Sequence, residues 1–193
     1  MISGGNLSNF MAKSSTIYEA TLTPLKSSST TINIAANNFT DDAGNSNNTA
    51  SNSFIWTYDG TPTTITVSAK ASGQTINSGS TSNDSTLILT FLTSEETTDL
   101  NIEDISITGG ELNNFVSSNF ASINGTLYNA TLIPSKSGTV TIKINSNSFT
   151  HQVGNGNIEA KPFNWNYDGT APIIFLLVTS GNDTISSGMT TTM

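Results

Sequence analysis

The stretch "FNWNYDGT", Phe163 to Thr170, nearly repeats "FIWTYDGT", Phe54 to Thr61, which lies roughly 110 residues earlier. Two further pairs of blocks keep the same order at similar separations: "ISGGNLSNF" from Ile2 with "ITGGELNNF" from Ile107, and "STIYEATLTP" from Ser15 with "GTLYNATLIP" from Gly125. Because three matched blocks keep their order, chance is a poor explanation. The sequence therefore predicts an array of repeats, with insertions confined to the loops between blocks.

The registers of these blocks divide the chain into three parts. Residues 1–60 correspond to the C-terminal part of a first repeat, residues 61–170 form a complete repeat, and residues 171–193 supply only the first strand of a third. We expect both ends to be cut out of a longer array. Repeat one would then lack its opening strands and leave open sheet edges and exposed apolar residues. Residues 1–60 alone are therefore expected to be poorly stable, whereas residues 61–170 should fold independently.

Alternation of apolar and polar residues marks the strands of the complete repeat. They are expected at residues 64–69, 85–92, 103–108, 111–116, 126–133, 139–144 and 162–167. Short strands of this number, separated by turn residues, favour an all-β fold of tandem immunoglobulin-like β-sandwich repeats. Helix-forming residues are sparse, so almost no helix is expected. Phe163, Trp165 and Tyr167 alternate on one face of the last strand, where core packing explains them better than a sugar-stacking platform does.

Composition excludes several classes of function. A net charge of -8 opposes binding to nucleic acid, whose phosphates need a face rich in Lys and Arg, and makes cations the more plausible partner. Cysteine is absent, so disulfide and thiolate chemistry are excluded. The longest apolar run, Pro172 to Val178, is too short to span a bilayer, which needs about 20 residues. The start of the chain does not resemble a signal peptide, so for an exported protein we expect the signal outside this chain.

Several turn and core segments follow one another in a characteristic order. In repeat two they are "FLTSEE", "DISITGGELNNF", "LYNATLIP", "SFTHQVGN" and "FNWNYDGTAP", and in repeat one "YEATLTP", "NFTDDAGNSN" and "WTYDGT". In this order they resemble the bacterial Ig-like repeats that occur in tandem in large bacterial surface proteins and adhesins. The resemblance covers nearly the whole chain. It implies an extracellular stalk or adhesin segment whose repeats are often stiffened by calcium, and it does not imply an enzyme.

Strand direction indicates which loops share an end of repeat two. If successive strands alternate in direction, the loops after the second and the sixth strand both return to the end where the linker from repeat one arrives. The first of these loops carries Glu95, Glu96 and Asp99, and the linker carries Asp59, so we expect the four acids to converge. Calcium takes six to eight oxygen ligands from carboxylates and carbonyls. The hypothesis is that calcium bridges neighbouring repeats here; solvated charge is the alternative for Glu95 and Glu96.

The loop after the sixth strand exists in two versions, "NFTDDAGNSN" in repeat one and "SFTHQVGNGN" in repeat two. Asp41, Asp42 and Asn45 of the first version would face the preceding repeat as calcium ligands. A plain turn is the alternative, because Asp, Asn and Gly are ordinary turn residues.

The second version has His151 and Gln152 in place of the two acids. Calcium should therefore bind more weakly at the Asp59 junction and leave a more flexible hinge. At the far end of repeat two, Asp168 would serve the junction with repeat three.

Catalysis is not predicted. Nucleophilic catalysis needs a nucleophile, a base and an orienting group within reach, and the sequence offers no such set. A glycosidase-like carboxylate pair is formally open among Glu95, Glu96 and Asp99, but these residues lie on a turn without an evident cleft. His151 is the sole histidine and has no Cys or second His to share a metal, so a transition-metal site is not expected, and the residue is predicted to lie exposed in its loop.

The leading functional prediction is a non-catalytic spacer or stalk segment of an extracellular bacterial surface protein. Its partners would be the neighbouring repeats of the same chain, with host glycan or protein bound through other domains. One alternative is an adhesive module that itself binds glycan or protein, for which Phe120 in a long loop of repeat two is the candidate contact. Another is an appendage of a secreted enzyme or a phage structural protein.

Overall fold

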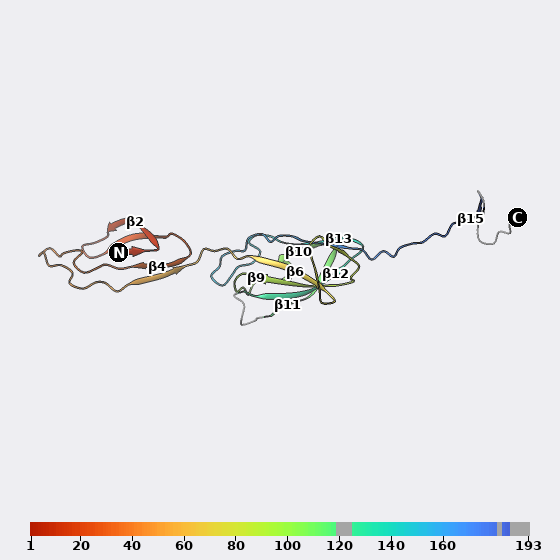
Figure 1. Cartoon of the computed structure of the whole chain (residues 1–193). Helices are drawn as coiled ribbons and strands as arrows, with labels where there is room; N and C mark the ends of the chain where they lie inside the picture. The colour runs from red at the N-terminus through yellow and green to blue at the C-terminus, as the bar shows by residue number, and fades with distance from the viewer. Residues whose placement is uncertain (119–124, 181–182, 186–193) are drawn as a thin grey trace.

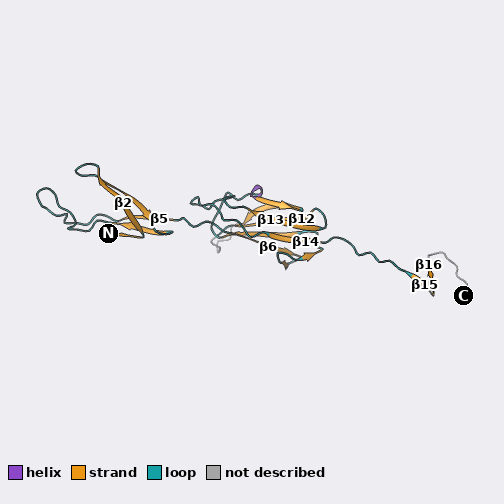
Figure 2. Cartoon of the chain, turned by 90° about the horizontal axis from the view of Figure 1, so that it is seen from above, coloured by secondary structure: helices purple, strands orange, loops and turns teal. Residues whose placement is uncertain are grey.

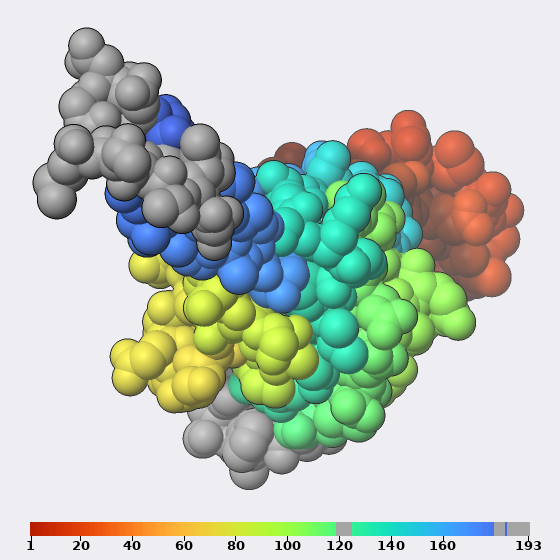
Figure 3. Space-filling model, turned by 90° about the vertical axis from the view of Figure 1, so that its right-hand side faces the viewer, coloured from red at the N-terminus to blue at the C-terminus, as the bar shows by residue number. Residues whose placement is uncertain are grey.

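The computed structural model describes residues 1–118, 125–180 and 183–185. Repeat one and repeat two lie end to end, and an extended segment leads from repeat two to a short C-terminal hairpin (Figure 1). The view from above shows the same linear order (Figure 2). Seen along the long axis, repeat one lies behind repeat two (Figure 3). The chain is therefore extended along one direction.

Repeat two is a sandwich of two sheets. Its strands are β6 (Ile65–Ala71), β7 (Gln74–Ile76), β8 (Thr81–Ser82), β9 (Leu87–Thr93), β10 (Ile105–Thr108), β11 (Gly110–Ser118), β12 (Leu127–Pro134), β13 (Gly138–Ile144) and β14 (Phe163–Tyr167). One sheet has the order β11-β12-β9-β6-β7 and the other β10-β13-β14-β8. The predicted all-β, Ig-like fold is confirmed. Each of the seven expected strands is present, and β7 and β8 are additional.

A single turn of 3-10 helix, η1 (Ile102–Asp104), occupies the start of the segment expected as the third strand. Asn101 caps it, because its side chain accepts a hydrogen bond from the Glu103 amide. The Asp104 carboxylate accepts a hydrogen bond from the Asn101 amide, which completes a capping box. The strand therefore begins later than the alternation predicted, at Ile105.

The two sheets enclose one apolar core. Trp165 of β14 is fully buried, and its indole nitrogen donates a 3.0 Å hydrogen bond to the Ser82 hydroxyl. Phe163 is also buried and Tyr167 packs against the same cluster, so the aromatic face of the last strand belongs to the core. Full burial of each large apolar side chain contributes roughly 1.5 to 3 kcal/mol. The other large buried side chains include Leu87, Leu89, Phe91, Leu132, Ile142, Ile144 and Phe149.

Repeat one has counterparts of the last five main strands of repeat two. They are β1 (Ile2–Ser3), β2 (Gly5–Ala12), β3 (Tyr18–Pro24), β4 (Ser28–Ile32) and β5 (Phe54–Tyr58). They form sheets of order β1-β4-β5 and β2-β3. In repeat two, β12 pairs on its other edge with β9, whereas among the described residues β3 pairs with β2 alone.

Among the described residues repeat one has no counterpart of β9, and an aromatic pair therefore lies in solvent. The rings of Phe10 and Tyr18 stack at 5.5 Å, as those of Phe115 and Tyr128 stack at 5.2 Å in repeat two. In repeat two, Phe91 of β9 packs against this pair. Phe10 of repeat one remains 72% exposed.

The C-terminal segment expected to begin a third repeat contains β15 (Val178–Ser180) and β16 (Asp183–Ile185), which form a hairpin. Ile173 to Leu177 ahead of it are exposed.

Candidate functional site at the junction of the repeats

The linker after repeat one is a compact turn built on Asp59. The Asp59 carboxylate accepts a 2.9 Å hydrogen bond from the Thr61 amide, and the Gly60 amide donates to the Ser27 hydroxyl at 2.9 Å. The bond from the Thr61 amide is the main reason why the pKa of Asp59 is lowered. The carboxylate is therefore ionised at neutral pH.

The same turn recurs after repeat two. The Asp168 carboxylate accepts a 3.0 Å bond from the Thr170 amide, and the Gly169 amide donates to the Ser137 hydroxyl at 3.0 Å. Asp168 is exposed. The repeated "YDGT" motif thus encodes one turn twice, and it presents one carboxylate at the exit of each repeat.

A buried asparagine holds the loop that carries His151. The side-chain oxygen of Asn157 accepts hydrogen bonds from the Ser148 and Phe149 amides at 2.8 and 3.1 Å. Its side-chain nitrogen donates to the carbonyls of Asn145 and Ile158, both at 2.8 Å. Asn47 makes the corresponding bonds in repeat one. The loop keeps its frame in both repeats because this asparagine holds it in each, and the bonds that Asp41 accepts in repeat one are an addition to that frame.

The linker and two loops of repeat two meet at one end of the sandwich, as strand alternation predicted. The Asn155 side chain donates a 2.9 Å hydrogen bond to the Asp59 carbonyl. The amide of Ile158 donates to the Thr63 carbonyl at 2.9 Å. The two loops also bond to each other, from the Gln152 amide to the Glu96 carbonyl at 3.2 Å.

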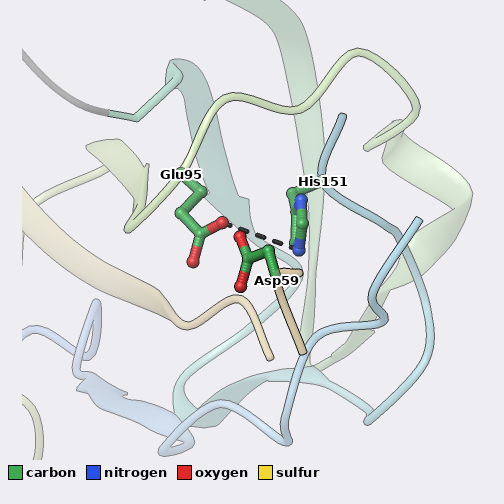
Figure 4. A group of neighbouring side chains, drawn as sticks. All are labelled: Asp59, Glu95 and His151. Atoms are coloured by element: carbon green, nitrogen blue, oxygen red, sulfur yellow. Dashed lines mark ion pairs between the residues drawn. The ribbon is translucent and has the colours of Figure 1, made fainter. Parts of the chain in front are cut away.

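Three ionisable side chains converge there (Figure 4). Asp59, Glu95 and His151 each offer a ligand atom within 4.8 Å of the others. His151 Nε2 lies 3.6 Å from a Glu95 carboxylate oxygen, and the His151 side chain is 2% exposed. Nε2 finds no hydrogen-bond partner among the described residues. The prediction that His151 is exposed is therefore wrong, because the linker and the Glu95 loop cover its ring from different parts of the chain.

Asp99 has a different role from the one expected. Its carboxylate accepts bonds from the Thr150 amide at 3.0 Å, the Thr150 hydroxyl at 2.7 Å and the Thr97 hydroxyl at 2.7 Å. Burial works to raise the pKa of Asp99, but these bonds outweigh it and the pKa is lowered. Asp99 thus joins the two loops directly. The Glu96 side chain is exposed, so two of the four expected acids, Asp59 and Glu95, meet in the cluster.

The corresponding loop of repeat one is closed on itself. The Asp41 carboxylate accepts bonds from the Ala43 amide at 3.0 Å, the Asn45 amide at 2.9 Å and the Asn45 side chain at 3.0 Å. The Asn45 side chain is the main cause of the lowered pKa of Asp41. Asp42 is exposed beside it. These contacts match an ordinary Asx turn, which needs no ion to hold its shape. Phe120, the expected contact of an adhesive loop, lies outside the described residues.

Comparison with known proteins agrees with the two-repeat architecture. The bacterial Ig-like domain family matches the chain twice, over residues 1–58 and 59–167. The searches of curated proteins and of solved structures find no match. In the part of the chain that the structure describes, no helix is long and apolar enough to cross a membrane. Domains of the matched family are generally non-catalytic structural or surface modules, and they commonly occur in surface or extracellular proteins. Since the two matches cover most of the sequence and coincide with the two sandwich units, this chain belongs to the bacterial Ig-like domain family.

Proposed function

We propose that this chain is a non-catalytic spacer segment of an extracellular bacterial surface protein. The observation that carries the proposal is a linker anchored at both ends. On the side of repeat one, Gly60 and Thr61 bond to the Ser27 hydroxyl at 2.9 and 3.1 Å. On the side of repeat two, Asp59 and Thr63 accept bonds from Asn155 and Ile158. Residues 59, 60, 61 and 63 thus each make a hydrogen bond to one of the two repeats. These bonds restrict movement of the linker and favour an end-to-end array.

Small-angle scattering combined with a spin-label distance between the two repeats tests the proposal. We expect an elongated particle and a narrow distance distribution. The double substitution Ser27→Ala and Asn155→Ala removes one anchor from each side and should broaden that distribution without lowering the melting temperature of repeat two. Ser137→Ala, which changes the equivalent anchor after repeat two, is the matched control and should leave the distribution unchanged. A broad distribution in the natural chain would refute the spacer function.

Calcium stiffening of the junction is a separate part of the proposal. The neighbouring carboxylates of Asp59 and Glu95 support it, because calcium prefers oxygen ligands. Calorimetric titration of the whole chain tests it. Absence of heat at millimolar calcium would remove calcium from the proposal and leave the spacer function untouched.

A further inference from the structure

His151 Nε2 is buried and has no hydrogen-bond partner among the described residues, which supports an inference beyond the spacer function. We propose that Asp59, Glu95 and His151 form a binding site for a divalent transition metal ion, for which Zn²⁺ is the probe. The site would join the linker of repeat one to two loops of repeat two. It requires three ligands only, with water at the remaining position, as in open zinc sites.

The environment of His151 Nε2 favours a bound cation. The His151 side chain is 2% exposed, and Nε2 lacks a hydrogen-bond partner among the residues described. Burying a polar atom without a partner is costly, so such an atom in a folded protein calls for a ligand. Nε2 points toward the two carboxylates (Figure 4). A cation between the three groups satisfies the nitrogen and neutralises the acids together.

The spacing of the ligand atoms also fits a metal ion. Nε2 and the nearer Glu95 oxygen are 3.6 Å apart, which is longer than the roughly 2.7 to 2.9 Å of a charge-assisted hydrogen bond. Zinc holds nitrogen and carboxylate oxygen at about 2.0 to 2.2 Å, so two ligands of one tetrahedral ion lie about 3.4 Å apart. The observed separation is close to that value. The Asp59 oxygen lies within 4.8 Å of both atoms, and the half-buried Asp59 side chain needs only a small movement to complete the site.

The chemical type of the three ligands indicates which metals the cluster prefers. Imidazole suits zinc, nickel, cobalt and copper, whereas calcium and magnesium take oxygen ligands. The one nitrogen in the set therefore favours a transition metal over calcium, so zinc and calcium are alternative occupants of this one cluster. The hydrogen bond from the Asn155 side chain to the Asp59 carbonyl holds the linker turn against repeat two and so helps to position the Asp59 carboxylate.

Binding requires one change in the ring. His151 Nδ1 accepts a 3.2 Å hydrogen bond from the Val153 amide, so the neutral ring carries its proton on Nε2. An ion on Nε2 moves that proton to Nδ1, and the Val153 amide must then turn to solvent. Val153 is exposed beside Gly154, whose φ of +94° places it in a tight turn, so the amide has room to reorient. The chemical shift of the Val153 amide should therefore report binding.

Calorimetry and NMR on the whole chain, after treatment with a chelator, test the site. We expect one Zn²⁺ per chain, with Kd below about 100 μM, and a zinc-induced shift of the His151 Nε2 resonance. His151→Gln, Asp59→Asn and Glu95→Gln should each weaken binding by about tenfold or more. Asp168→Asn is the matched control, because Asp168 lies in the same turn after repeat two without a histidine nearby. It should leave zinc affinity unchanged.

Three outcomes would overturn the proposal. They are zinc binding that is not saturable below about 1 mM, affinity that survives His151→Gln, and calcium binding tighter than zinc through Asp59 and Glu95 alone. The last would show an oxygen-only site. The NMR shift in the natural chain decides the matter without any variant, should a substitution disturb folding. None of these outcomes bears on the elongated shape, which tests the spacer function separately.

Discussion

Replacing Asn157 by alanine should destabilise repeat two more than any change to an acid of its loops. Asn157 is 2% exposed and makes four hydrogen bonds to the backbone, two as acceptor and two as donor. Each contributes roughly 1 kcal/mol net, and buried groups left without a partner cost roughly 1 to 3 kcal/mol. If water takes the place of some of these bonds, the free energy of unfolding of repeat two should fall by about 3 to 5 kcal/mol. That is a large share of the roughly 5 to 15 kcal/mol that stabilise a typical domain.

Urea unfolding followed by tryptophan fluorescence measures this loss. In a Trp56→Phe background, Trp165 in the core of repeat two is the single tryptophan, so the signal reports that repeat alone. Asn47→Ala changes the corresponding residue of repeat one and should not alter the urea concentration at which Trp165 fluorescence reports unfolding. Asn157→Asp keeps the two acceptor bonds and should cost less than Asn157→Ala. A loss below about 1 kcal/mol for Asn157→Ala would refute the argument that this residue determines the loop.

Three further predictions concern stability. Because the pKa of Asp99 is lowered in the folded state, its ionised carboxylate stabilises repeat two above the ordinary pKa of 3.8. This stabilisation disappears as pH falls through the lower pKa of the folded state. Asp99→Asn should therefore make the free energy of unfolding of repeat two less dependent on pH in the acid range. An unchanged dependence on pH would contradict that role. Gly125→Ala should destabilise repeat two by about 2 kcal/mol or more in thermal unfolding, because the added methyl group would collide with the Thr93 carbonyl oxygen. Gly73→Ala, with open space but a φ of +80°, shows for comparison the cost of backbone strain without a collision. Residues 1–60 expressed alone should be digested rapidly by protease, because apolar side chains such as Phe10 and Phe54 are exposed, whereas residues 61–170 should resist digestion. Protection of the first fragment would contradict this expectation.

Local pattern was sufficient to predict the strands and the class of fold. Strict alternation within segments such as Gly138–Ile144, where Val140, Ile142 and Ile144 are the buried residues, reflects a sheet with one buried face, and this regularity is visible without tertiary information. Strand direction also placed the Glu95 loop and the His151 loop at the same end, because antiparallel neighbours leave no other arrangement. β7 and β8 were missed since they contain only three and two residues, too few for a period to be recognised.

The chemistry of the junction was less predictable, because it depends on which atoms are already occupied. Asp99 looked like a metal ligand in the sequence, yet the amide and hydroxyl of Thr150 occupy its carboxylate from a loop far along the chain. His151 looked like a loop residue, yet segments from two other parts of the chain bury it. Composition indicates which ligand types are available, but only the folded contacts indicate which remain free.

The replacement of Asp41 in one repeat by His151 in the other yields a last prediction, which rests on the proposed metal site. Both residues occupy the same place in a frame held by Asn47 or Asn157, so His151→Asp should keep the loop, and the new carboxylate can accept turn bonds as that of Asp41 does. Its negative charge is nevertheless added near Asp59 and Glu95, so without an ion the carboxylates repel and the melting temperature in chelator should fall. With no nitrogen left in the cluster, the preference should move from zinc toward calcium. The measurement is the melting temperature of the natural chain and of His151→Asp, each in chelator, in zinc and in calcium. A variant that is as stable as the natural chain in chelator and indifferent to calcium would show that the three side chains do not share one ion, since such a site must respond both to added charge and to the loss of its nitrogen.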